Sequence, residues 1–128
     1  MGFIEKTKQV KLIKFEKPIK PQYENGEIVC WVLAEKGAND GKYYKPGMSS
    51  LEYKIGERIK SGKGFLELGE GFLRLRDARK SKFVHIIIRA TTMSKDIIAF
   101  GYISTLLTAF PALKTKRMFF QVVCNEKG

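Results

Sequence analysis

The sequence predicts an α+β domain, with a curved antiparallel sheet, one long helix in the C-terminal half and one short helix. Three observations favour this class. Short apolar runs alternate with turn residues, an uncharged run of helical length follows the most apolar of them, and no repeat or long linker interrupts the chain. A chain of 128 residues can bury a core without disulfides or metal, so we expect a single domain over residues 1–128.

Four strands are predicted from apolar runs bounded by turn residues. Residues 8–15 (KQVKLIKF) and 27–34 (EIVCWVLA) are separated by a loop that contains proline, asparagine and glycine. Residues 83–90 (FVHIIIRA) carry enough isoleucine for a central strand, buried on at least one face. Residues 118–124 (MFFQVVC) form the last strand and close the domain.

A hairpin is predicted over residues 65–76 (FLELGEGFLRLR), with its turn at residues 69–71. Because side chains alternate along a strand, its four leucines then share one face and can cover a core. The opposite face sets aromatic rings among charges: Phe65, Glu67, Phe72, Arg74 and Arg76. Such a face offers stacking rings and phosphate-pairing charge together.

Two helices complete the expected fold. A short one at residues 50–60 is indicated by Ser49 and Glu52, which fit a capping box. The long one covers residues 94–110, where Ser94 suits the N-cap and the following proline ends the run.

The long helix would be apolar around its whole circumference, so it needs cover on more than one side. The sheet supplies one side and a second subunit the other, which predicts a homodimer or higher oligomer. Its uncharged run, residues 97–113, is at the lower limit for crossing a membrane, about 17 residues. The run also contains Gly101, Ser104 and Pro111, so we expect a buried helix and no membrane partner.

The net charge of +11, from 24 Lys and Arg against 13 Asp and Glu, favours a polyanionic partner. A plain lysine-rich, soluble surface would give the same balance. The turn at residues 77–82 (DARKSK) adds three cations beside the hairpin, and Phe83, His85 and Arg89 share one face of the next strand. Rings stack on unpaired bases while cations neutralise phosphates, which favours single-stranded DNA or RNA bound with little sequence preference.

The predicted nucleic-acid-binding residues are Phe65, Phe72, Arg74, Arg76, Arg79, Lys80, Lys82, Phe83 and Arg89, with Lys42, Tyr43 and Tyr44 of the 36–48 loop as a second contact. An alternative remains. The phenylalanines could instead pack under the long helix or against a partner, in a protein-interaction or assembly component of a viral or nucleoprotein particle.

The sequence predicts no catalytic residue, metal or cofactor, and we expect no enzyme. One histidine supplies no catalytic triad, and two distant cysteines supply no zinc pattern. Residues 56–64 place five residues between glycines where a phosphate loop needs four. Cys30 and Cys124 lie in apolar segments and fit buried free thiols, although a disulfide between them stays open. A reducing, cytoplasmic setting is therefore expected, with nucleoid or virion association as variants.

The order of these elements resembles that of single-stranded nucleic-acid-binding modules of the Whirly and Pur type. The similar region is residues 63–110, where KGFLELGEGFLRLRDARKSKFVHIII is followed by TTMSKDIIAFGYISTLLTAF. In those families a curved antiparallel sheet is followed by a helix. The resemblance implies that the sheet binds the strand while the helix packs behind it or mediates oligomerisation.

Overall fold

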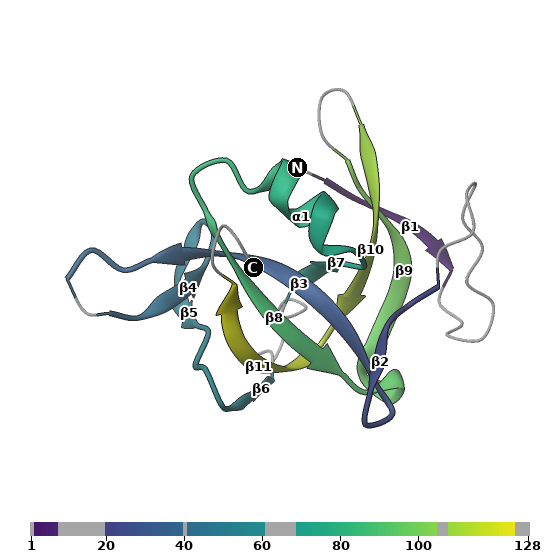
Figure 1. The fold of residues 1–128 in the computed structure, drawn as a ribbon, viewed down its shortest axis with the longest axis horizontal. Helices are drawn as coiled ribbons and strands as arrows, with labels where there is room; N and C mark the ends of the chain where they lie inside the picture. The colour runs from purple at the N-terminus through teal and green to yellow at the C-terminus, as the bar shows by residue number, and fades with distance from the viewer. Residues whose placement is uncertain (1, 8–19, 40, 61–68, 105–107, 125–128) are drawn as a thin grey trace.

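The computed structural model describes residues 2–7, 20–39, 41–60, 69–104 and 108–124. These residues form a mostly antiparallel sheet with one short α-helix, so the predicted α+β class with a long helix is wrong (Figure 1). In chain order the elements are β1 (Gly2–Thr7), β2 (Tyr23–Glu24), β3 (Glu27–Lys36), β4 (Tyr43–Lys45), β5 (Met48–Glu52), β6 (Arg58–Lys60), β7 (Gly69–Phe72), α1 (Leu75–Ser81), β8 (Ile86–Thr92), η2 (Ser94–Asp96), β9 (Ile97–Ser104), β10 (Ala109–Thr115) and β11 (Arg117–Cys124).

The main sheet has the strand order β1-β9-β10-β7-β3-β8-β11-β6. It is strongly curved, and α1 lies against one of its faces near β3 and β7 (Figure 1). β2 pairs with the start of β3, whereas β4 pairs with its end and carries β5 on its other side. β3 is therefore the central strand on which the surrounding elements are arranged.

β3 is buried on both faces, which explains its continuous apolar run. Cys30 and Val32 point into one core cluster, together with Phe100 of β9 and Phe120 of β11. Trp31 and Leu33 point into a second cluster, which also contains Ala78 of α1. We call these two sides of the sheet the inner face and the α1 face.

Residues 69–71 form part of strand β7 and not the predicted hairpin turn. Gly71 pairs with Leu113 of β10, and a Cβ atom added to it would lie 2.6 Å from Cys30 Sγ. Atoms cannot approach so closely, so only glycine lets β7 lie against β3 at this point. Its neighbour Phe72 pairs with Trp31 and enters the core under α1.

The β2–β3 connection is a two-residue turn in which Asn25 and Gly26 both have positive φ, 51° and 78°. Asn-Gly is the preferred sequence for such a hairpin turn, because both residues tolerate the left-handed region. The turn places Glu24 directly opposite Glu27. Two carboxylates thus lie at one end of the sheet.

The predicted long helix at 94–110 is wrong, because the described residues of this stretch form η2, β9 and the start of β10. β9 lies between β1 and β10, and Leu113 of β10 pairs with Phe100. Both faces of β9 are largely buried, so the alternation typical of a strand is absent from its sequence. The long helix required by the resemblance is absent from the described residues, and so is the helical surface from which an oligomer was expected.

The predicted short helix at 50–60 is also wrong: its residues belong to β5, a connection and β6. Ile59 pairs with Met118 of β11 and packs against the inner core. The strand at 27–34 is confirmed within β3 and that at 118–124 within β11. The strand at 83–90 begins only at Ile86, and residues 8–15 lie outside the described part of the chain.

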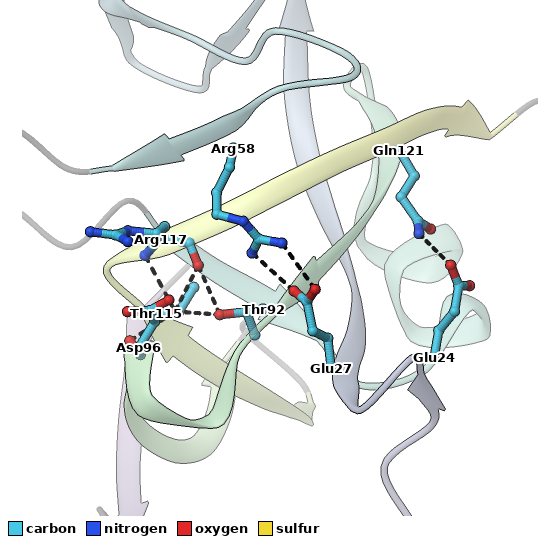
Figure 2. A network of polar contacts seen from close by, with 8 residues as sticks. All are labelled: Glu24, Glu27, Arg58, Thr92, Asp96, Thr115, Arg117 and Gln121. Carbon is cyan, nitrogen blue, oxygen red and sulfur yellow. Dashed lines mark hydrogen bonds and ion pairs between the residues drawn. The ribbon is translucent and has the colours of Figure 1, made fainter.

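A buried hydroxyl pair joins the end of β8 to the turn between β10 and β11 (Figure 2). Thr92 Oγ1 and Thr115 Oγ1 are 2.8 Å apart, and Thr92 Oγ1 lies 2.8 Å from the carbonyl oxygen of Arg117. The amide of Lys116 already donates to the carbonyl of Asp96. Thr115 Oγ1 lies 2.9 Å from the same carbonyl oxygen, which can accept from both groups. Thr115 donates either to Asp96 or to Thr92, and in both arrangements the two buried hydroxyls are satisfied.

Candidate nucleic-acid interface

The candidate site is built on α1, a helix of two turns that is fixed to the α1 face at its centre. Ala78 is fully buried in the cluster that contains Trp31 and Phe72. The neighbouring Asp77 is also buried, and its carboxylate accepts from Arg74 Nε at 2.7 Å and lies 3.6 Å from Arg76 Nε. Burying a carboxylate is costly unless cations lie beside it. Arg74 is therefore held by Asp77 as part of the protein's own structure.

The chain leaves α1 through a tight turn that presents Phe83. The amide of His85 donates to the carbonyl of Lys82 at 2.6 Å, which closes the turn. Phe83 has φ +47°, in the left-handed region that bulky residues seldom adopt. Its side chain is 89% exposed, and that of Val84 is 77% exposed. Large apolar side chains held outward by a strained backbone are typical of functional sites.

Cations surround this exposed tip. Arg79 and Lys80 are exposed on the last turn of α1, and Lys82 precedes the aromatic residue. Arg79 and Lys82 also line an adjacent groove of about 510 Å³, whose apolar wall includes Ile86 and Ile87. We call Arg79, Lys80, Lys82, Phe83 and Val84 the basic corner.

The structure brings together four of the predicted binding residues in the basic corner: Arg79, Lys80, Lys82 and Phe83. Arg76 lies one helical turn away, with an exposed side chain. Phe72 is 1% exposed, so its ring is not presented to a ligand in this structure. Phe65 lies outside the described residues.

Arg89 lies on the α1 face, as Ile87 does, but its guanidinium is already paired with other side chains. Its Nη1 lies 2.6 Å from Glu24 Oε2 and also donates to Gln121 Oε1. Gln121 Nε2 in turn donates to Glu24 Oε1 at 2.6 Å (Figure 2). The hydrogen bonds from Arg89 and Gln121 lower the pKa of Glu24 below its ordinary value, because they stabilise the ionised form.

A second arginine at this end of the sheet is paired in the same way. Arg58 makes two 2.9 Å hydrogen bonds to the carboxylate of Glu27, and its guanidinium lies 5.6 Å from the centre of the Phe119 ring. The pair, drawn in Figure 2, lines a pocket of about 250 Å³. The two carboxylates of the β2–β3 hairpin thus neutralise both arginines here, whereas the opposite end of the sheet carries the basic corner.

Tyr43 and Tyr44, which belong to the predicted second contact, lie on β4. The strand register shows where β4 lies relative to the start of β8. Tyr43 pairs with Lys36 at the end of β3, and Ile86 pairs with Ala34 two residues earlier. β4 and the start of β8 therefore lie at the same end of the sheet. Lys42 Nζ is 4.0 Å from a Glu52 carboxylate oxygen, and Tyr43 packs on the inner core.

The two cysteines lie on opposite faces of the sheet and are both free. The disulfide that the sequence left open is therefore not formed. Burial raises the pKa of Cys30 to about 12. Cys124 is half-buried, lines the groove beside Arg79, and has its pKa raised mainly by burial.

The chain matches no protein-family model, and no curated protein or solved structure is significantly similar to it. Within the described residues no cluster of three or more His, Cys, Asp and Glu side chains is placed to hold a metal ion. The described helices include none that is long and apolar enough to span a membrane.

Sequence reasoning missed Val84 and Cys124 as parts of the site. Val84 follows Phe83 directly and precedes three isoleucines, so the apolar run predicted a strand through all of them. The break comes from the left-handed turn at Phe83, a residue type that gives no signal for it. Cys124 joins the groove only because it pairs with Ile87 across the sheet.

Proposed function

We propose that this protein binds single-stranded nucleic acid, with little sequence preference, through the basic corner. The observation that carries the proposal is the exposed Phe83 ring among Arg79, Lys80 and Lys82. Arginine and lysine pair with phosphates of any sequence, and an aromatic ring stacks on any base. Unpaired strands are favoured over duplex, whose bases are already stacked on one another.

The distribution of charge across the α1 face supports this placement. Arg58 and Arg89 already bind Glu27 and Glu24, so a phosphate at that end would have to displace a carboxylate. The exposed cations of α1 lie at the other end, next to the groove. We therefore place the bound strand over the basic corner and the adjoining groove, with Tyr44 and Lys42 of the 42–44 segment at the same end of the sheet.

A second candidate function is that of an assembly component, and Val84 favours it. An exposed aliphatic side chain beside an exposed ring suits a protein partner, because it cannot contact phosphate. Replacing the cations of the basic corner by neutral residues distinguishes the two candidate functions. Loss of the cations weakens oligonucleotide binding under the first proposal, whereas it leaves an apolar protein contact largely intact under the second.

The proposal is tested by a fluorescence polarisation titration with single-stranded DNA, single-stranded RNA and duplex over a range of salt. We expect single strands to bind more tightly than duplex and affinity to fall steeply with salt. The variant Arg79→Gln/Lys82→Gln should reduce the slope of log affinity against log salt by about 1.4, for two phosphates at about 0.7 each. Lys95→Gln, in η2 beyond the far end of β8, removes one exposed cation as a control. No binding to any oligonucleotide at low salt would refute the proposal.

A further inference from the structure

Phe83 is the most exposed large apolar residue of the described part of the chain, at 89%. So little of the residue is covered that a ligand can reach both faces of its ring. Phe119, by contrast, is half-buried and has the Arg58 guanidinium over its ring. A ring that lies on a sheet can stack on one base, whereas a ring with two open faces can contact a base on each side.

The tip that carries Phe83 is held at both ends. The turn is closed by the hydrogen bond from His85 to Lys82, and the preceding helix is anchored by the buried Ala78. The connection arches outward between α1 and the start of β8 (Figure 1). Because the backbone at Phe83 is already in the left-handed region, the ring is presented before any ligand arrives.

We propose that Phe83 inserts between two neighbouring bases of the bound strand and holds them apart, with Val84 against the edge of the opened step. This inference rests on the proposed function, since it describes how the same corner contacts its ligand. Arg79 and Lys82 line the adjacent groove and supply charge complementary to the phosphates on either side of the opened step. In duplex DNA, apolar wedges such as phenylalanine are known to insert between base steps and unstack them.

The free energy of insertion depends on how many stacking contacts are lost and gained. Insertion breaks one base–base stack and forms two ring–base stacks, so the exchange is favourable only for a ring that is uncovered on both sides. The opened step must lengthen by about 3.4 Å, the thickness of one stacked layer. A single strand accommodates this extension more easily than a duplex does, because no paired strand has to lengthen with it.

The test uses a single-stranded oligonucleotide of alternating 2-aminopurine and adenine, so that the position of the protein along the strand does not matter. Stacking quenches 2-aminopurine, and insertion should raise its emission as wild-type protein saturates the strand. Saturation is judged by polarisation of the same sample. Phe83→Ala should lose this rise when brought to equal saturation, and Phe83→Leu should retain part of it.

Tyr23→Ala is the matched control, because it removes another exposed aromatic ring, near the opposite end of the sheet. It should give the same rise as the wild type. If the wild type saturates the strand without a rise, or if Phe83→Ala gives the full rise, insertion is refuted while strand binding stands. If no polarisation change occurs at all, the proposed function fails as well.

An aromatic substitution at the same exposed position gives an independent measurement. Trp31 is the only tryptophan in the chain and is buried under α1, so its emission should not respond to a strand. In Phe83→Trp the new indole should be quenched on binding. A strand with an abasic site at every second position offers one base at every step, so at equal saturation it should relieve part of the quenching. Unchanged quenching on that strand would show contact with one base and overturn insertion.

Discussion

Arg89 Nη1 lies 2.6 Å from Glu24 Oε2, which joins β8 to the β2–β3 hairpin. Gln121 of β11 completes the contact by donating to the other oxygen of the same carboxylate. Three strands, β2, β8 and β11, are thereby tied together. The pair also explains why one predicted phosphate contact, Arg89, is not part of the basic corner.

The Glu24 contact predicts a pH-dependent contribution to stability. The folded-state pKa of Glu24 lies below its ordinary value of 4.5, so its contribution is present above that pH and is lost as pH falls through the folded-state pKa. Urea unfolding of the wild type and Glu24→Gln should therefore differ at neutral pH and converge in acid. Glu57→Gln, at an exposed carboxylate in the β5–β6 connection, controls for the lost charge. A difference that widens below pH 4.5 would contradict the assignment.

The sequence predicted the strands in which burial and β-branched residues coincide. β3 and β11 were found because their apolar runs are short and are bounded by turn residues. β9 was mistaken for part of a helix because both of its faces are largely buried, so its sequence shows no apolar–polar alternation. Its partners β1 and β10 also had to be recognised as strands before a sheet could be inferred. Such non-local pairing is invisible in one sequence.

The candidate site was predicted in part. Arg79, Lys80, Lys82 and Phe83 are close in sequence, so their proximity needed no knowledge of the fold. Phe72 was placed on the surface because residues 69–71 looked like a turn. The glycines of this segment suggested a turn. At Gly71, however, the missing side chain allows close approach to Cys30. A glycine needed for a turn and a glycine needed for close packing look the same in a sequence until the strand pairing is known.

Gly71→Ala should destabilise the protein, since its new Cβ would lie 2.6 Å from Cys30 Sγ and 2.7 Å from Cys30 Cβ. Overpacking of a core usually costs about 1–3 kcal/mol of unfolding free energy. Chemical denaturation of Gly71→Ala in the wild-type and Cys30→Gly backgrounds measures it. The penalty should shrink in the second background, because both contacts belong to the Cys30 side chain. An equal penalty in both would show that β7 does not pack on Cys30.

Cys124 should report occupancy of the groove through its reactivity. The buried Cys30, with a pKa of about 12, should remain unmodified in the folded protein, and N-ethylmaleimide should label only Cys124. The rate should rise with pH, because the pKa of Cys124 is also raised and the thiolate is the reactive form. Saturation with a single-stranded oligonucleotide should slow the labelling, as followed by mass spectrometry. An unchanged rate would place the strand away from the groove.

The proposed nucleic-acid site depends most on Phe83. Its most direct test is the affinity of Phe83→Ala for a single-stranded oligonucleotide, compared with that of Tyr23→Ala. Stacking contributes about 1–3 kcal/mol per base, so we expect Phe83→Ala to lose about tenfold or more in affinity, with the salt slope and the melting temperature unchanged. Tyr23→Ala should bind as the wild type does. Wild-type affinity in Phe83→Ala, at equal stability, would contradict the basic corner as the nucleic-acid site.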